Sequence, residues 1–360
     1  MRLSVTFAVS LCCLSTTAVS QTFTTQVLET GLSSPTGIAV TPGGDLYFTE
    51  VPTPGTGGTT SQNTVRVRDG QTGTISMIAM NEPEPVNLAI LGNDVYWTCR
   101  TAGVIVRRQN GTNAVWQMGL SSPSGIAPAP NGDLVITQIP TPGMAAGSNS
   151  VDRIDAVGMA TQLSMGEPEP YDVAVDDDGN VYWTCRTAGV ILRYDADTGT
   201  KAPILRGLDR PTGIDVDAAG NLYFTEVPTP GVGGMAGGEN KVWQFSPETS
   251  EFTLISMGEP EPTDITVSPD GSRVYWTCTS AGVIVMAQRT GSQPSITTTS
   301  TTALGDTVRF IIDAPGYGGM SYALGNSAGL GPIPVGSRFL ALELDPLLRA
   351  TFAAPDMPYT

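Results

Sequence analysis

The chain contains no histidine in its 360 residues. This absence excludes Ser-His-Asp and Cys-His catalysis, histidine general bases and histidine metal ligands. Basic residues are also scarce, because 18 lysines and arginines are set against 34 aspartates and glutamates, for a formal net charge of −16. Such an acidic chain is repelled by nucleic acids and by anionic membrane surfaces. We therefore expect neither as a partner, and favour a small molecule, a glycan or an extracellular protein.

Long apolar runs are confined to the N-terminus. Residues 1–20 combine the basic Arg2, a mostly apolar stretch and the small residues Ala18 and Ser20. This is the pattern of a secretory signal peptide that is cleaved after Ser20. No later run approaches the roughly 18 apolar residues that a membrane-spanning helix needs. The sequence thus predicts a secreted or periplasmic protein without a membrane span.

Internal repetition is what the chain has in abundance. One pattern, Gly-Leu-Ser-Ser-Pro-Thr-Gly-Ile in its first copy, opens what we call an X unit. A second pattern, Glu-Pro-Glu-Pro, opens a Y unit. Self-similarity at a fixed period is the signature of a repeat architecture. The units alternate, and begin at Gly31, Glu82, Gly119, Glu167, Gly207 and Glu259.

Each unit leads through a turn into an aromatic strand. X units carry Leu-Tyr-Phe-Thr-Glu in two of three copies, and Y units carry Val-Tyr-Trp-Thr-Cys in all three. The opening prolines lie 38 to 51 residues apart, which is the period of a four-stranded propeller blade. The sequence therefore predicts an all-β, six-bladed β-propeller made of three X–Y blade pairs. The prolines are Pro35, Pro85, Pro123, Pro170, Pro211 and Pro262.

The last blade has no convincing outer strand of its own. Residues 22–28 precede the first unit as residues 251–256 precede the last Y unit. We predict that this N-terminal segment is the outer strand of the sixth blade, closing the ring and covering an edge. The predicted organisation is a signal peptide at 1–20, the propeller at 21–293, and a linker with a small Gly-rich C-terminal β module at 294–360.

The pattern Pro-x-Gly-Ile-x-Val followed by Gly-[Asp/Asn]-Leu-Tyr resembles NHL-repeat propellers and their gluconolactonase-like relatives, over about Thr22 to Gln288. The resemblance implies that the loop entering each inner strand and the loop after each second strand open on one face, around the channel. It also implies a metal in this region, as gluconolactonase-like enzymes use one. Propellers host many activities, so the resemblance leaves the function open.

The X units have long loops after their second strand, at residues 51–62, 139–149 and 227–240, where the Y units have tight turns. Each begins with Val or Ile followed by Pro-Thr-Pro-Gly, and continues into Gly-, Ala- and Ser-rich sequence. We interpret them as three flaps around one mouth, the alternative being solvated linkers. The ligand-binding residues predicted at this mouth are Glu50, Gln138, Glu226, Glu84, Glu169, Glu261, Arg100 and Arg186.

Carboxylates are the candidate metal ligands. Glu50 and Glu226 end X-blade strands, and Gln138 takes the matching place in the third blade. Carboxylate oxygens that converge on a channel suit a hard cation such as calcium. One interpretation is thus a calcium site at Glu50 and Glu226. The other is that the acids accept backbone N–H bonds in their turns, or pair with Arg100 and Arg186.

Cys99, Cys185 and Cys278 occupy one position in three alternate blades. A disulfide needs Cα atoms within about 7 Å, and alternate blades hold these strand ends too far apart. We therefore interpret the cysteines as small apolar residues buried between blades.

The regular repetition favours a binding module that holds a small molecule, glycan or protein segment at the channel mouth. Catalysis needs asymmetric roles, and here the candidate residues come in threes. The alternative is a calcium-dependent, lactonase-type hydrolase in which a metal polarises a carbonyl, with Glu50 and Glu226 as the acids to test. A lyase similar to the virginiamycin B lyases ranks third, because that chemistry calls for the missing histidine.

Overall fold

The computed structural model describes residues 22–52, 62–140, 148–228 and 240–290, together with four short strands nearer the C-terminus. The chain divides into two compact units, one of which is Thr22–Thr290. The other comprises Met1–Gln21 and Gly291–Thr360. Most of the three predicted flaps, at 53–61, 141–147 and 229–239, and the predicted signal peptide lie outside the described residues.

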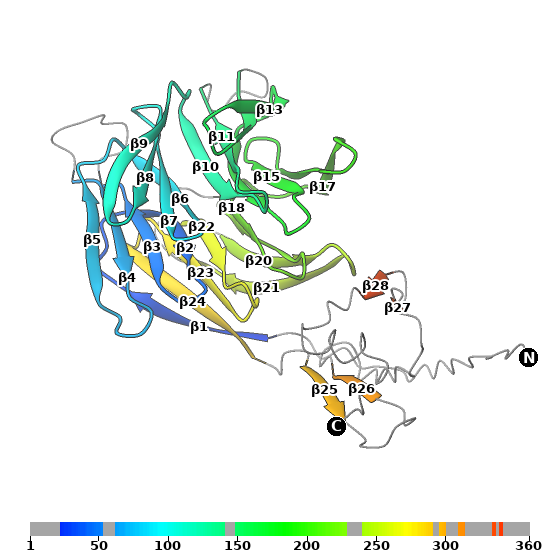
Figure 1. Cartoon of the computed structure of the whole chain (residues 1–360). Helices are drawn as coiled ribbons and strands as arrows, with labels where there is room; N and C mark the ends of the chain where they lie inside the picture. Colours follow the sequence, from blue (N-terminus) through cyan, green and yellow to red (C-terminus); the bar gives the residue numbers. More distant parts are fainter. Residues whose placement is uncertain are drawn as a thin grey trace, which may run out of the picture. The chain divides into compact units, whose positions relative to one another are not determined.

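The unit Thr22–Thr290 is a six-bladed β-propeller (Figure 1), as predicted. Every blade is a four-stranded antiparallel sheet. Blade one consists of β2 (Pro35–Val40), β3 (Leu46–Glu50), β4 (Thr64–Arg68) and β5 (Ile75–Met80). Blade two consists of β6 (Pro85–Leu91), β7 (Asp94–Cys99), β8 (Val104–Gln109) and β9 (Thr112–Met118). Blade three consists of β10 (Pro123–Pro128), β11 (Leu134–Gln138), β12 (Ser150–Ile154) and β13 (Ala160–Met165).

The second half of the ring repeats this plan. Blade four consists of β14 (Pro170–Val175), β15 (Val181–Cys185), β16 (Val190–Tyr194) and β17 (Lys201–Arg206). Blade five consists of β18 (Pro211–Val216), β19 (Leu222–Glu226), β20 (Lys241–Ser246) and β21 (Glu251–Met257). Blade six consists of β22 (Pro262–Val267), β23 (Arg273–Cys278), β24 (Val283–Thr290) and β1 (Thr22–Glu29).

The ring closes through its N-terminal strand. β1 pairs antiparallel with β24, in a register that places Thr22 opposite Thr290. In Figure 1 the blue β1 lies beside the yellow β24. The predicted outer strand of blade six is therefore confirmed. Pairing first and last segments covers an edge of β24 that would otherwise be free to pair with another chain.

The hydrophobic core lies between neighbouring blades, because each blade is covered on both faces by the next. One cluster joins Tyr182 and Ile191 of blade four to Ile214 and Phe224 of blade five. The middle strands are apolar on both faces for this reason, and do not alternate as a half-exposed strand would. The three tryptophans of the Tyr-Trp-Thr-Cys strands are fully buried in such clusters, as Trp97, Trp183 and Trp276.

The first glutamate of each Glu-Pro-Glu-Pro pattern belongs to this packing. Glu82 Oε2 accepts a hydrogen bond from Trp97 Nε1 at 2.9 Å and lies 3.5 Å from Cys99 Sγ. Burial, and then the negative charge of Glu82, raise the pKa of the Cys99 thiol far above its ordinary value. Cys185 and Cys278 have the same surroundings. All three cysteines are free and buried, which confirms their interpretation as small residues buried between blades.

The second unit is described only in part. β25 (Ser295–Thr299) pairs with β26 (Arg309–Asp313), and β27 (Ile333–Val335) pairs with β28 (Arg338–Leu340). The rest of the predicted C-terminal module lies outside the described residues. In the part of the chain that is described, no helix has the length and apolar character to cross a membrane.

Candidate functional site

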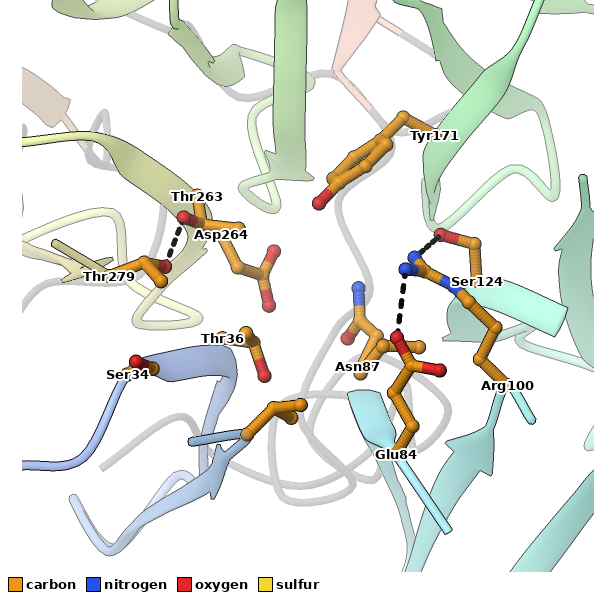
Figure 2. Close-up of a pocket in the computed structure, with 12 residues that line it drawn as sticks. Ser34, Thr36, Glu84, Asn87, Arg100, Ser124, Tyr171, Thr263, Asp264 and Thr279 are labelled. Carbon is orange, nitrogen blue, oxygen red and sulfur yellow. Dashed lines mark hydrogen bonds and ion pairs between the residues drawn. The ribbon is translucent and has the colours of Figure 1, made fainter. Parts of the chain in front are cut away.

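A cavity of about 160 Å³ opens at the mouth of the central channel. Its lining comes from five blades, and ten of the twelve lining residues are polar types, which supply hydroxyls, an amide, two carboxylates and an arginine (Figure 2). A single water molecule needs roughly 10–15 Å³ of such volume, so the cavity has room for a small organic group. The lining residues are Ser34, Thr36, Val51, Glu84, Val86, Asn87, Arg100, Ser124, Tyr171, Thr263, Asp264 and Thr279.

Two of the predicted mouth residues, Glu84 and Arg100, line this cavity. They lie 3.5 Å apart as an ion pair between the loop before β6 and the end of β7. Arg100 Nη2 donates to Ser124 Oγ of blade three at 3.2 Å, and Thr101 Oγ1 donates to Glu84 Oε2 at 2.5 Å. Figure 2 shows Glu84, Arg100 and Ser124 on one side of the cavity. The pairing holds the guanidinium in place across two blades.

Blade four repeats the pair with a different neighbour. Arg186 donates to Glu169, and its guanidinium lies 4.6 Å from the centroid of the Tyr171 ring. Thr187 Oγ1 also donates to Glu169, at 2.5 Å. Burial alone would raise the pKa of Glu169, but the bonds from Arg186 and Thr187 outweigh it and hold that pKa below its ordinary value. Tyr171 brings an aromatic ring to the mouth that the sequence prediction had not included.

Glu50, Gln138 and Glu226 have a common role elsewhere. Their Oε1 atoms accept backbone N–H bonds of 2.6 to 2.7 Å from Ser33, Ser121 and Asp209, which belong to the loops entering their own blades. None of the three lines the mouth cavity. An amide oxygen, like a carboxylate oxygen, can accept this bond. Glutamine can therefore occupy the equivalent position in the third blade.

The second oxygens of the two glutamates are engaged as well. Glu50 Oε2 lies 2.8 Å from Thr64 Oγ1 and 2.6 Å from Arg66 Nε. Glu226 Oε2 accepts from Trp243 Nε1 at 2.7 Å. The structure does not bring Glu50 and Glu226 together, since each serves its own blade. Calcium at these residues stays a prediction, and the protein donors around both carboxylates weigh against it.

The sequence patterns did not predict a polar cluster on the channel axis. Asn87, Asp172 and Asp264 are equivalent residues at the starts of β6, β14 and β22, two positions after the opening proline. Asn87 Nδ2 donates to Asp172 Oδ1 at 2.7 Å. Figure 2 shows Asn87 and Asp264 directed toward the middle of the cavity. The alternation of Pro-x-Asn or Pro-x-Asp with Pro-x-Gly was the signal that could have revealed it.

The two aspartates of this axial cluster are strongly perturbed. Burial raises the pKa of Asp172 to about 7, although backbone N–H bonds from Ile214 and Val173 oppose the change. Burial, and then the nearby Asp172 carboxylate, raise the pKa of Asp264 well above its ordinary value. Among the residues described, no lysine or arginine is bonded to either group. Two like charges in one buried site favour a shared proton.

The described residues contain no group of three or more His, Cys, Asp or Glu side chains that could hold a metal ion. The axial cluster has two carboxylates and one amide, all oxygen-bearing groups of the kind that calcium binds. A second cavity of about 320 Å³ is lined by the same three side chains and by the inner strands of all six blades. The cluster therefore stands between two cavities of the channel.

Fold and mouth together define a six-bladed β-propeller with a polar cavity at one end of its channel. No protein-family model matches the chain, and no curated protein matches its sequence significantly. Several solved structures match its fold. Virginiamycin B lyase from Staphylococcus aureus is 18% identical, with a TM-score of 0.52 over 74% of this chain and 99% of that chain. A variant of that lyase with a histidine replaced by alanine is catalytically inactive, and its structure was solved with quinupristin.

Two further matches come from other classes. A gluconolactonase from Xanthomonas campestris is 14% identical, with a TM-score of 0.59 over 76% of this chain and 96% of that chain. Regucalcin, a calcium-binding protein from Agrobacterium tumefaciens, is 16% identical, with a TM-score of 0.58 over 75% of this chain and 96% of that chain. At such identities the shared feature is the fold, which hosts a lyase, a lactonase and a calcium-binding protein alike.

Proposed function

We propose that this propeller is a binding module that holds a small polar ligand, or a polar group of a glycan or protein segment, in the mouth cavity. The observation that carries the proposal is the cavity itself, in which Arg100, Tyr171 and several hydroxyl groups converge from different blades. A concave site with a few convergent polar groups is the usual form of a ligand pocket. The signal-like residues 1–20 support a binding role outside the cytoplasm.

Binding is favoured over catalysis by the chemistry of the residues present. The three thiols are buried and their pKa values are raised, so they supply no thiolate nucleophile. The lyase from S. aureus is inactive in its histidine-to-alanine variant, and this chain has no histidine to take such a role. Glu84 and Glu169 are held as ion pairs with Arg100 and Arg186, which leaves them poor general bases.

Filling the cavity tests the proposal. Thr263 lines the mouth at the position that Tyr171 occupies in blade four, so Thr263→Tyr places there a side chain that another blade already accommodates. Small metabolites, sugars and short peptides would be screened by ligand-observed NMR against the wild-type protein and this variant. We expect the compounds that bind the wild-type protein to lose at least about tenfold in affinity, roughly 1.4 kcal/mol, at an unchanged melting temperature.

The matched control is Thr24→Tyr, which adds the same side chain at an exposed position of β1. It should bind every hit as the wild-type protein does. Hits that bind Thr263→Tyr as tightly as the wild-type protein would place the binding surface elsewhere and refute the mouth as the site.

The axial cluster favours a second candidate function, a calcium-dependent hydrolase of lactonase type. Asp172 and Asp264 are buried in contact without a bonded cationic side chain in the described chain, so a divalent cation would supply the charge that the cluster lacks. The two carboxylates and the Asn87 amide would hold it, next to the mouth cavity that Asp264 also lines. A cation bound there would polarise the carbonyl group of a lactone.

Calcium titration decides between these functions. In the hydrolase account, calcium raises the melting temperature of the wild-type protein, and Asp172→Asn abolishes the rise while Glu226→Gln leaves it intact. Glu226→Gln is the matched control, because blade three carries glutamine at the equivalent position, Gln138. A rise that is lost only in Glu226→Gln would instead favour the strand-end carboxylates. If calcium at up to millimolar concentration does not raise the melting temperature, the proposed hydrolase is left without its cofactor.

A further inference from the structure

The three Glu-Pro-Glu-Pro loops are copies of one backbone. Their second glutamates, Glu84, Glu169 and Glu261, have positive φ angles of 58° to 59°. In each copy the backbone N–H of this glutamate donates to the carbonyl of the first glutamate at 2.9 Å. Its own carbonyl accepts from the first residue after the Tyr-Trp-Thr-Cys strand, at 3.0 to 3.1 Å. The three carboxylates therefore start from equivalent positions around the mouth.

Two of these carboxylates are neutralised by arginine, and the third is not. The residue that bonds back to the glutamate carbonyl is Arg100 in blade two and Arg186 in blade four, and both pair with their glutamate. In blade six it is Thr279. The side chain of Thr279 is used differently, since its hydroxyl donates to the carbonyl oxygen of Pro35 in blade one at 2.7 Å.

The second partner is lost as well. Thr101 and Thr187 donate to Glu84 and Glu169, whereas Ser280 in blade six donates to the carbonyl oxygen of Pro260. Across the described parts of the propeller, no side chain bonds the Glu261 carboxylate, and this residue is half-buried. Glu261 thus has the charge of its two counterparts without the cation that each of them has.

The mouth cavity extends to the place of this missing arginine, because Thr279 lines it; the Glu261 side chain lies next to the cavity lining in sequence and is not part of it. Half of its lining comes from blade six and the adjoining blade one, including Thr263, Thr279 and Thr36. Thr263 replaces the Tyr171 ring that stacks under Arg186, which leaves space at this side. Figure 2 shows the threonines facing the cavity opposite the Glu84–Arg100 pair. Thr36 of blade one is equivalent to Ser124 of blade three, which accepts the hydrogen bond from Arg100.

We propose that the ligand of this mouth carries a guanidinium group, which occupies the place of the missing third arginine and pairs with Glu261. This inference rests on the proposed function and names the chemistry of its ligand. A guanidinium matches a carboxylate with two parallel N–H donors, and its remaining N–H groups can reach the Thr36 hydroxyl as those of Arg100 reach Ser124. The acidic surface of the chain, with net charge −16, attracts such a cation from solution.

The decisive variant supplies the missing side chain. In Thr279→Arg, the introduced guanidinium should pair with Glu261 as Arg100 and Arg186 pair with their glutamates, and exclude the ligand. The probes are ethylguanidinium, its neutral counterpart ethylurea, and the capped peptide Gly-Arg-Gly, which separate a free guanidino compound from an arginine side chain. We expect ethylguanidinium or the peptide to bind the wild-type protein at least tenfold more tightly than ethylurea does. Thr279→Arg and Glu261→Gln should each abolish this preference.

Thr24→Arg is the matched control, because it adds the same side chain and charge at an exposed position of β1, outside the cavity lining. It should retain binding, and melting curves of all variants should show a folded propeller. Equal binding of ethylurea and ethylguanidinium, or full guanidinium binding by Thr279→Arg, would overturn the inference. If hits then still lose affinity in Thr263→Tyr, the mouth remains the binding site and only its cation specificity is refuted. If they do not, the binding function falls as well.

Discussion

Gly213→Ala is expected to destabilise the propeller by about 3 kcal/mol, as overpacking of a rigid core does. An alanine Cβ at this position would lie 2.7 Å from Asp264 Cα and 2.9 Å from Ile265 N, both atoms of the backbone of blade six. These backbone atoms cannot move to another rotamer as a flexible side chain can. The inner strands β18 and β22 would therefore have to separate. Chemical unfolding of the purified variant measures the loss.

The same close approach occurs at Gly37 and Gly125, which face Asn87 and Asp172. The three X-blade glycines thus let the axial residues of the next Y blade come near. Gly43→Ala is the control, because the only neighbour of its added Cβ is the Thr41 hydroxyl, at 3.6 Å. It should change the free energy of unfolding by less than about 0.5 kcal/mol. Equal effects of Gly213→Ala and Gly43→Ala would show that the inner strands are not packed as closely as described.

The axial cluster should make the protein less stable as pH rises from 5 to 8. The pKa of Asp172 lies at about 7 in the folded chain, above its ordinary value of 3.8, so the folded state binds more protons than the unfolded state between these values. The stabilising contribution of Asp172 is then fully present below pH 4 and is lost as pH rises through 7. At about 1.4 kcal/mol per pH unit, the two units between pH 5 and this pKa correspond to a loss on the order of 3 kcal/mol. Asp215, with a pKa raised by burial to about 6, acts in the same direction.

Asp264→Asn isolates this effect. The variant carries an amide, as blade two does at Asn87, and cannot add a second negative charge beside Asp172. We expect it to be destabilised at pH 5, where the wild-type pair shares a proton, and to lose less or even gain stability at pH 8. Asp177→Asn, at an exposed position of blade four, should keep the wild-type pH slope. If the free energy of unfolding of Asp264→Asn depends on pH as that of the wild-type protein does, the two carboxyl groups do not titrate as a pair.

The architecture could be predicted because the repeat reports it directly. Six proline-led units at a blade's period, and a terminal segment that matches an outer strand, left one way to close the ring, and β1 closes it. The cysteines were also predictable, since equivalent positions in alternate blades cannot reach one another. These conclusions need only the order and spacing of elements, which a repetitive sequence displays.

The site was harder to predict because residues at equivalent positions make different contacts. Glu50 and Glu226 looked like ligands for a cation, yet they accept N–H bonds from their own loops, a role that Gln138 fills as well. Asn87 lies at the start of an inner strand whose sequence is similar to that of the other inner strands. Its contact with Asp172 joins residues far apart in sequence. Which oxygen meets which donor depends on distances between blades, and the spacing of residues along the chain does not contain them.

The most direct test of ligand binding at the mouth is a fluorine NMR titration of Tyr171. Incorporated 3-fluorotyrosine gives each tyrosine a separate signal, and Tyr171→Phe identifies the one that lines the cavity. Compounds that bind the wild-type protein but not Thr263→Tyr should shift the Tyr171 signal in proportion to occupancy and leave the buried Tyr223 signal in place. If such compounds saturate the protein while the Tyr171 signal stays fixed and another tyrosine responds, the ligand does not bind at the mouth of the channel.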